Sequence, residues 1–583
     1  MAFDVTRRGS NEATHVTTST SAVLDSAHTG DIVGALGTIK QHDTGGRRSW
    51  WQRLRTLLVI MGPGLVAMVG DNDAGGVITY AHAGQNYGTH LMWTLALLIP
   101  VLYVNQEMVV RLGAVSGVGH ARLIFQRFGK FWGAFSVTDL FIVNALTIIT
   151  EFIGVSMALQ FLGMSKYLAV PLGAVLLFAT VALGSFRTWE RFLFVLIAIN
   201  ILVIPMALMV HPTVGETAKG MVPNLPGGLN STLLLLIVAL VGTTVAPWQL
   251  FFQQSNVVDK RITPRWLRYE RADLWIGIAI CMTGALCLMS VTAFGLAGTN
   301  LVGQFTDAAG VAHGLFQHAG HTVGVIFAIV LLDASLIGAN AVALATTYTL
   351  GDVFKVRHSL HWKITQAPWF YAAFAGLIGV SAAVVLIPGA PLGLITQGVQ
   401  ALAGVLLPSA TVFLVLLCND KPVLGPWVNS LRQNIVAGVI VWSLVLLSLA
   451  LTAATFFPNL STTTLKVGFG VGAGIGVLGG VLLALSRRIA ARKQVVATAN
   501  ALGGLDPDEV EELVEDVHEA LTRKERRALL WQDRLAWRTP ALETLERPAF
   551  SSLRKAGLLT LRGYLVLAVS LVAVKVVQLA LGG

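Results

Sequence analysis

Long apolar stretches are the feature of this 583-residue chain that most restricts its fold. A helix of about 20 apolar residues crosses the hydrocarbon of a bilayer, which is about 30 Å thick. Because lipid offers the backbone no hydrogen bonds, such stretches fold as helices. The sequence therefore predicts an all-α polytopic membrane protein. Its twelve predicted crossings lie at approximately 57–81, 89–113, 133–163, 167–184, 190–211, 231–255, 273–298, 320–350, 367–388, 393–418, 433–456 and 465–487.

The composition agrees with a membrane protein. Hydrophobic residues make up 54% of the chain and charged residues 12%, whereas about a quarter of residues are charged in soluble proteins. The net charge of +10 suits basic residues that lie beside anionic lipid headgroups. The lipid bilayer is therefore the expected partner, and nucleic acid is not. The three cysteines lack metal-type spacing and predict no disulfide framework. The oligomeric state stays open.

The loops between the predicted crossings differ in charge. Lys and Arg gather on one side, most densely over residues 260–271, whereas the other side holds Lys166, Lys219 and Lys466. Short cytoplasmic loops carry an excess of Lys and Arg. The distribution thus predicts a multi-pass protein of the plasma membrane with a cytoplasmic N-terminus.

Polar segments flank the predicted twelve-helix domain, which covers 57–487. Residues 1–56 are rich in Ser and Thr and lack the apolar core of a secretory signal, so they are predicted to form a disordered cytoplasmic tail. Residues 488–556 predict a charged helical segment in the cytoplasm. The stretch at 557–583 predicts one more transmembrane or interfacial helix, because Lys575 interrupts it.

The first predicted crossing is interrupted at its centre by the heptapeptide Gly70-Asp-Asn-Asp-Ala-Gly-Gly76. Ionisable side chains at membrane depth are costly, and they usually mark the path of an ion or substrate. Clustered glycines disfavour a continuous helix. The heptapeptide therefore predicts a broken helix with Asp71 and Asp73 at the break, as in transporters that expose helix ends to an ion.

The sixth predicted crossing is interrupted in the same way, by Val241-Gly-Thr-Thr-Val-Ala-Pro-Trp-Gln249. Pro247 cannot donate a backbone hydrogen bond and clashes with the preceding turn. The two breaks are five crossings apart, so their helices run in opposite directions. This spacing predicts an inverted repeat of five plus five helices, approximately 57–211 and 231–418. A cation between the breaks would meet carboxylate and carbonyl oxygens, which hard divalent ions prefer.

Several short motifs occur at positions typical of one protein family. They are Gly62-Pro-Gly, Asp73-Ala-Gly-Gly76 in place of Asp-Pro-Gly-Asn, Gln106 with Arg111-Leu-Gly113, Thr147 with Glu151-Phe-Ile-Gly154, and Gln400 eight residues before Pro408. With these motifs, residues 62–426 resemble the natural-resistance-associated macrophage protein (NRAMP) transporters of divalent metals. The resemblance implies a LeuT-like fold with discontinuous helices 1 and 6, followed here by additional C-terminal helices.

The sequence also departs from that family at three positions in the third and sixth crossings. Ala246-Pro247-Trp248 stands where the family has Met-Pro-His, and Ile148 stands where it has a third-helix aspartate. Loss of the thioether removes a ligand that favours softer metals over Mg²⁺. The departures resemble the NRAMP-related magnesium transporter branch. They imply transport of partly hydrated Mg²⁺ and/or Mn²⁺ without obligatory proton coupling, because two groups associated with proton movement are replaced.

The breaks and the resemblance together name the candidate residues. The residues expected at the metal are Asp73, Asp71, Gly76, Thr243, Ala246, Gln249 and Gln400, and those expected along the transport path are Glu151 and Trp248. Asp73 could instead cap the second half of the first helix. Asp71 could instead line the hydrated cavity, cap a helix, or accept a hydrogen bond from a group that itself binds the metal. The two glutamines could join helices by hydrogen bonds. The metal is expected as substrate, and no cofactor is expected.

Two other transport functions stay open. One is a proton-coupled Mn²⁺/Fe²⁺ transporter of the ordinary NRAMP type. The other is a cation-coupled symporter of an organic solute with the same fold, although the acidic first break would repel a carboxylate substrate. The sequence contains no paired nucleophile and base, no His-Cys metal cluster and no nucleotide-binding loop, so an enzyme is not expected.

Overall fold

The computed structural model describes residues 22–23, 26–182, 184–228, 230–389, 392–457, 461–501 and 531–548, with single positions or short runs between 555 and 570. Regular structure in this part of the chain is almost entirely helical, with one two-stranded antiparallel sheet. The elements are η1 (Ser26–His28), β1 (Ile32–Gly34), β2 (Gly37–Ile39), α1 (Trp50–Ile60), α2 (Pro63–Val69), α3 (Ala74–Tyr87), α4 (Met92–Ser116), α5 (His120–Phe128), α6 (Lys130–Phe161), α7 (Lys166–Ala182), α8 (Phe186–Asn200), α9 (Val203–Met209), α10 (Val214–Gly220), α11 (Ser231–Thr244), α12 (Pro247–Asp259), η2 (Pro264–Trp266), α13 (Leu267–Gly295), α14 (Ala308–His318), α15 (His321–Phe354), α16 (Pro368–Leu386), α17 (Leu392–Cys418), α18 (Lys421–Leu424), η3 (Gly425–Trp427), α19 (Leu431–Phe456), α20 (Thr462–Ala501) and η4 (Leu542–Thr544).

The helical membrane architecture predicted from the sequence is confirmed. Within the described ranges, 10 helices are long and apolar enough to cross a membrane, or up to 11 if the bent pair α1 and α2 is one crossing. Helix α7 coincides with the fourth predicted crossing but is a shorter apolar helix. The additional helix predicted at 557–583 lies largely outside the described residues.

The first crossing is built from three helices rather than one. Helices α1 and α2 meet at an angle of 57°. The chain turns there at Gly62, whose φ of +154° is a conformation that L side chains rarely adopt. Residues 70–73 then separate α2 from α3. All seven residues of α2 are buried, so this half-helix is enclosed by its neighbours.

The sixth crossing is broken once, at the position predicted from Pro247. Helix α11 ends at Thr244, and Ala246 is extended with φ −84° and ψ 146°. Pro247 occupies the first position of α12, where its missing N–H has no role in the helix. The break thus places proline where a helix tolerates it, and leaves the end of α11 and the start of α12 facing the first crossing.

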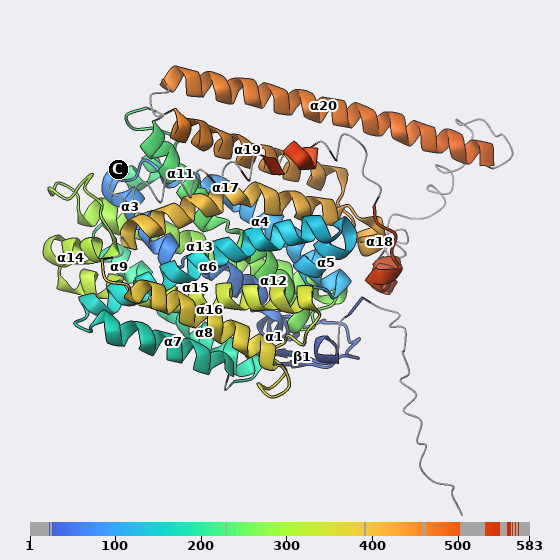
Figure 1. Ribbon diagram of the computed structural model, residues 1–583, viewed down its shortest axis with the longest axis horizontal. Coiled ribbons are helices and arrows are strands. Elements are labelled where there is room, and N and C mark those ends of the chain that lie inside the picture. Colours follow the sequence, from blue (N-terminus) through green and yellow to red (C-terminus); the bar gives the residue numbers. More distant parts are fainter. Residues whose placement is uncertain are drawn as a thin grey trace, which may run out of the picture.

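The two broken crossings lie inside the bundle (Figure 1). Helix α3 packs against α11 and α13, and α15 packs against α6. The most apolar window of the α11–α12 crossing is 94% buried, whereas the corresponding window of α20 is 6% buried. Figure 1 shows α20 as a long helix apart from the rest, on the side of α19. The break of the sixth crossing is therefore enclosed by protein, whereas α20 leaves its apolar surface exposed.

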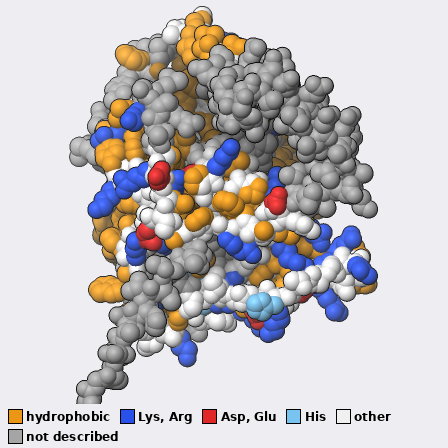
Figure 2. All heavy atoms as spheres, turned by 90° about the vertical axis from the view of Figure 1, so that its right-hand side faces the viewer, with side chains coloured by type: hydrophobic (Ala, Val, Ile, Leu, Met, Phe, Trp, Pro, Cys, Tyr) orange, Lys and Arg blue, Asp and Glu red, His pale blue; other side chains and the backbone are white. Residues whose placement is uncertain are grey.

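Basic side chains gather at one end of the bundle, which we call the basic face. Its loops and helix ends carry Arg187, Arg261, Arg265, Arg268 and Lys355. Figure 2 looks onto the side of the molecule on which α5, α18 and β1 lie in Figure 1, and shows Lys and Arg spread over it. Such a surface suits contact with the anionic headgroups of one leaflet.

The N-terminal segment corrects one prediction. The sequence predicted a disordered tail over 1–56, but residues 26–56 contain η1, the hairpin β1–β2 and the start of α1. The hairpin pairs Ile32 with Ile39, and both side chains are buried. The polar composition of these residues did not predict their structure, because they are ordered by packing against the membrane helices. Residues 1–21 lie outside the described residues.

The C-terminal segment returns to the basic face. Of the charged segment predicted over 488–556, α20 extends to Ala501 and residues 531–548 are described, whereas residues 502–530 lie outside the described residues. The carboxylate of Glu543 lies 3.8 Å from Arg122 and 3.3 Å from Lys355. The backbone N–H of Ala22 donates to the carbonyl of Thr539 at 3.2 Å. The two terminal segments thus meet on the same surface.

Candidate functional site

Asp73 lies at the first break as the N-cap of α3. Its Oδ1 accepts a hydrogen bond of 2.7 Å from the backbone N–H of Gly76, and 3% of the residue is exposed. A side-chain acceptor at this position satisfies an N–H that the helix itself cannot. The structure therefore shows Asp73 in the capping role that was one of its two predicted roles.

Asp71 is placed differently from Asp73. It is fully buried, and neither carboxylate oxygen has a hydrogen-bond partner among the described residues. Within them it also forms no ion pair. A buried carboxylate without a partner is strongly unfavourable. Asp71 is thus the group at the break whose environment most requires a positive charge.

The second break lies directly against the first. A Cβ placed on Gly76 would be 3.4 Å from Oγ1 of Thr243, and a Cβ on Gly70 would be 3.1 Å from the ring of Trp248. The hydroxyl of Thr243 has no partner within the described part of the chain. Ala246 lies in the second break, 5% exposed, and brings no donor or acceptor on its side chain. A Cβ on Gly76 would also lie 2.5 Å from the backbone oxygen of Asp71, so the two breaks pack closely where position 76 is glycine.

Two buried glutamines approach the same region. Gln400 on α17 contacts Gly75 so closely that a Cβ there would overlap its amide, and its Nε2 has no partner among described residues. Gln249 on α12 accepts at Oε1 a hydrogen bond of 3.1 Å from Gln106. The structure thus brings Gln400 to the first break, whereas Gln249 joins α12 to α4, which is the alternative that the sequence left open.

Glu151 connects the first break to the third crossing. Its Oε2 accepts a hydrogen bond of 3.1 Å from the N–H of Ala74, while Oε1 has no partner in the described ranges. A Cβ on Gly338 would touch both Glu151 and Asp73, so these two carboxylates lie against the same point of α15. Three acidic residues therefore surround the start of α3.

The arrangement supplies mainly oxygen donors, and the thiol of Cys281 on α13 lies 3.7 Å from Oδ1 of Asn72 beside them. Carboxylates of Asp71, Asp73 and Glu151 lie at or beside the first break, together with the hydroxyl of Thr243 and the amide of Gln400. Hard divalent cations prefer such oxygen ligands. Among the described residues, no group of three His, Cys, Asp or Glu side chains has the geometry of a preformed metal cluster. A cation here would keep water or use amide, hydroxyl and backbone oxygens.

Three polar residues of this region were not among the predicted site residues. Tyr80 and Thr244 share a hydrogen bond of 2.8 Å, which joins α3 to α11 next to the breaks. The amide of Asn72 donates to the carbonyl of Cys281 at 3.0 Å, which anchors the first break to α13. A signal existed for Tyr80, because it lies seven residues after Asp73 and hence on the same face of α3.

Two other acids within the crossings have partners away from the breaks. Glu107 forms ion pairs of 3.2 Å with Arg111 and 2.7 Å with Arg271, so it belongs to a structural network. Asp333 on α15 accepts a hydrogen bond of 3.4 Å from Asn200. Neither contact involves the two breaks. Of the membrane acids considered from the sequence, those that the structure brings to the first break are Asp71, Asp73 and Glu151.

Comparisons with known proteins agree with this fold. A family model described as natural resistance-associated macrophage protein-like matches residues 64–454. The chain is 25% identical over 424 residues to the divalent metal cation transporter MntH of Lacticaseibacillus casei (strain BL23), which covers 69% of this chain and 90% of that protein. It is 25% identical over 431 residues to MntH of Burkholderia ambifaria, with coverage of 70% and 91%.

Similarity to solved structures extends over most of the chain. The crystal structure of the Eremococcus coleocola manganese transporter, in complex with an aromatic bis-isothiourea substituted compound, has a TM-score of 0.59 at 19% sequence identity and covers 80% of this chain and 98% of that one. At this identity the likeness shows the fold.

A bundle of membrane helices with two crossings broken at facing positions defines a membrane transporter and not an enzyme. The family match covers more than half of the chain. The protein belongs to the natural resistance-associated macrophage protein family.

Proposed function

We propose that the protein carries divalent metal cations, Mg²⁺ and/or Mn²⁺, across the plasma membrane. The observation that carries this proposal is the set of buried oxygen donors at the first break, above all Asp71, whose two oxygens lack partners among the described residues. The relatives described as divalent metal cation transporters support the same substrate class. The metal is the substrate and not a cofactor.

The proposed preference for hard ions rests on Ala246. At the break of the sixth crossing this residue replaces the thioether expected from the family, so oxygen ligands remain and the discrimination against Mg²⁺ is lost. Mg²⁺ gives up its waters reluctantly. Ala246 and Gly76 replace the larger Met and Asn of the family, and a site without those side chains suits an ion that keeps part of its hydration shell.

Transport without obligatory proton coupling is proposed from two other residues. Ile148 and Trp248 cannot exchange a proton in place of an aspartate and a histidine. Both side chains are fully buried in the third crossing and at the start of α12. The membrane potential, worth about 2.3 kcal/mol per charge per 100 mV, would then drive uptake together with the metal gradient.

The test is to measure metal influx and internal pH in the same proteoliposomes. Mg²⁺, Mn²⁺ and Ca²⁺ are supplied in turn, with an amino-acid panel as the comparison. We expect influx of Mg²⁺ and Mn²⁺ without acidification. Stoichiometric proton entry with Mn²⁺ and no Mg²⁺ influx would instead identify an ordinary proton-coupled Mn²⁺/Fe²⁺ transporter, and uptake of an amino acid alone would identify a symporter of organic solutes.

We further propose that the basic face is cytoplasmic, so that the N-terminus and residues 531–548 lie inside the cell. The distribution of Lys and Arg supports this orientation. Labelling of a single cysteine introduced at Arg265, in intact cells and after permeabilisation, tests it. Labelling by an impermeant reagent in intact cells would reverse the orientation.

A further inference from the structure

The segment 26–39, which we call the strap, crosses the basic face and is bound there by arginines of α8. Arg187 donates to the carbonyl of Gly34 at 3.2 Å and to the hydroxyl of Thr38 at 2.5 Å. Arg191 donates to the carbonyl of Ala35 at 2.8 Å. Two of these bonds go to backbone carbonyls and one to a side-chain hydroxyl, so the strap is held on α8 by both main chain and side chain.

Glu190, which lies between those two arginines, joins the strap to the membrane helices. It is fully buried and accepts a hydrogen bond from the backbone N–H of Ala35. Its other oxygen is 2.6 Å from the ammonium of Lys260, at the end of α12. Lys260 also donates to the carbonyl of Met61 at 2.7 Å. One buried ion pair therefore connects the strap, α8, α12 and the junction of α1 with α2.

The strap also packs directly on α1. Ile32, Ala35 and Ile39 are each 5% exposed or less. A Cβ placed on Gly37 would lie 2.7 Å from Cγ2 of Val59. Apolar burial next to the Glu190 bond means that α1 cannot move away from α8 unless the strap moves as well.

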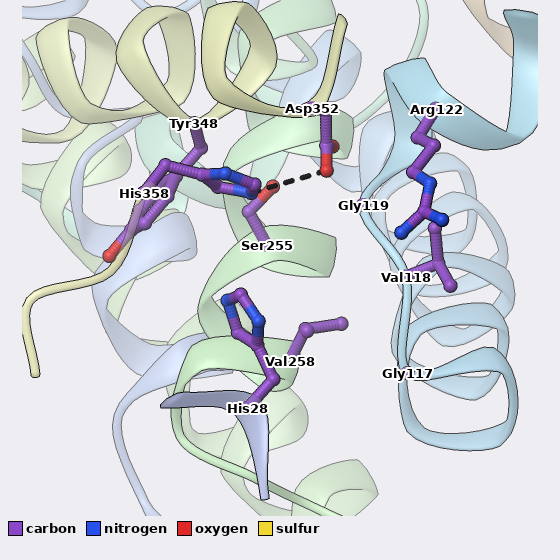
Figure 3. A pocket seen from close by; sticks show the side chains of 10 residues that line it. All are labelled: His28, Gly117, Val118, Gly119, Arg122, Ser255, Val258, Tyr348, Asp352 and His358. Carbon is purple, nitrogen blue, oxygen red and sulfur yellow. Dashed lines mark ion pairs between the residues drawn. The ribbon is translucent and has the colours of Figure 1, made fainter. Parts of the chain in front are cut away.

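The first residues of the strap reach a second group of helices. Arg261 donates to the carbonyls of Ala27 and Asp31, at 2.7 and 3.2 Å. The ring of His28 lies 5.5 Å from that of His358, between centroids. Figure 3 shows both rings in a small pocket, together with Asp352, which pairs with His358 at 3.2 Å. The strap therefore spans from α8 to the loop after α15.

The strap closes the route between the first break and the basic face. Helix α2 leads from the strap-bound junction at Met61 to Asp71, and all its residues are buried. If a cation moved along α2 between Asp71 and the basic face, α1 and α2 would have to separate from α8 and α12, to which the Glu190–Lys260 pair joins them. The Glu190–Lys260 pair and the strap hold these four helices together.

We propose that the strap is part of the gate on the basic face and must detach from Glu190 in each transport cycle. Glu190 is then the positioning residue that connects the strap to the junction of α1 and α2. The proposal rests on the proposed function for the identity of the transported ion. Hinge or gate motions of this kind often limit turnover. The strap is held by hydrogen bonds from the side chains of Arg187 and Arg191 and by the hydrogen bond between Ala35 and Glu190. Breaking these few bonds would release it while the helices of the bundle stay folded.

A reversible cross-link tests the proposal. In the variant G37C/V59C the two Cβ atoms fall near the separation of about 3.8 Å that a disulfide requires. We expect oxidation to lower Mn²⁺ uptake by at least about tenfold, because the gate cannot open, and reduction to restore it. Wild-type uptake by fully oxidised protein would overturn the proposal. The single variants G37C and V59C, treated with the same oxidant, are the controls.

A second pair of variants tests the opposite change. R187Q/R191Q weakens the strap without altering Glu190 or Lys260, and we expect uptake to rise about two- to tenfold and hydrogen exchange of residues 32–39 to accelerate. The control R268Q/K363Q removes the same charge from the same face, outside the contacts of the strap. Faster exchange in R187Q/R191Q with unchanged uptake would show that the strap is structural and overturn its gating role.

The two proposals can fail separately. Binding of Mn²⁺ by purified protein in detergent, followed as a rise in melting temperature, measures the site without the gate. Loss of binding and uptake in the wild-type protein would refute the proposed function. Retained binding and uptake, unaffected by the cross-link, would refute the gate alone.

Discussion

The break region and the strap contact surface use buried polar groups in opposite ways. At the breaks, Asp71, Thr243 and Gln400 have side-chain atoms without partners among the described residues. Under the strap, Glu190 and Lys260 satisfy each other and two backbone groups. Burial is similar in both regions, so burial does not distinguish them. At the first break the unpartnered groups are where we expect a ligand, whereas the Glu190–Lys260 pair holds helices together.

The largest effect that this comparison predicts is loss of transport in D71N and D73N. Asparagine keeps an oxygen, so D73N still accepts the hydrogen bond of Gly76 and α3 remains capped. We expect metal uptake to fall by about 100-fold or more. Removing a buried carboxylate that pairs with a cation costs several kcal/mol. Uptake and melting temperature are measured together. Near wild-type uptake in both variants would mean that the first break is not the cation site.

Substitution of a buried acid whose ion pairs are already formed should lower stability and leave transport unchanged. Glu107 pairs with Arg111 and Arg271, and E107Q leaves these guanidinium groups without their carboxylate. Removing one partner of a buried pair costs about 3 kcal/mol or more, so we expect a lower melting temperature with unchanged affinity for Mn²⁺. E216Q, on the exposed helix α10, removes the same negative charge and is the matched control. A change in metal affinity without loss of stability would contradict the comparison.

A smaller effect is expected for selectivity at the second break. A246M restores a thioether between α11 and α12, and sulfur favours Mn²⁺ over Mg²⁺. We expect the ratio of Mn²⁺ to Mg²⁺ uptake to rise by about tenfold, equivalent to about 1.4 kcal/mol. A246L has a similar volume without sulfur and separates ligand chemistry from crowding. Equal shifts in A246M and A246L would attribute the preference to size.

The smallest effect concerns the pocket beside the strap. Burial opposes the charged form of His358, but the hydrogen bond and the negative charge of Asp352 outweigh it and raise the pKa of His358 above its ordinary value. The pair therefore stabilises the fold fully below about pH 6.5, the unfolded value, and loses this contribution as pH rises through the folded pKa.

We expect H358Q to lower the melting temperature most in mildly acidic buffer and little in alkaline buffer. H318Q, at the end of α14 and away from this pocket, controls for loss of an imidazole. A difference between wild type and H358Q that grows with pH would show that the neutral ring is the stabilising form.

Local sequence determined much of this protein. Apolar stretches located the crossings, glycines and Pro247 located both breaks, and Asp71 and Asp73 marked the first of them. These signals are local, because helix formation in lipid and helix breaking depend on neighbouring residues. For the same reason the strap was not predicted, because its residues show no periodic apolar pattern.

Only the tertiary structure decided which residues meet. Glu190 binds Ala35, 155 positions earlier, and Lys260, 70 positions later. Gln400 reaches Gly75, whereas Gln249 accepts a hydrogen bond from Gln106, although the same two roles were predicted for both glutamines. Such partnerships depend on how helices distant in the chain pack together, and packing selects one of several chemically equivalent partners.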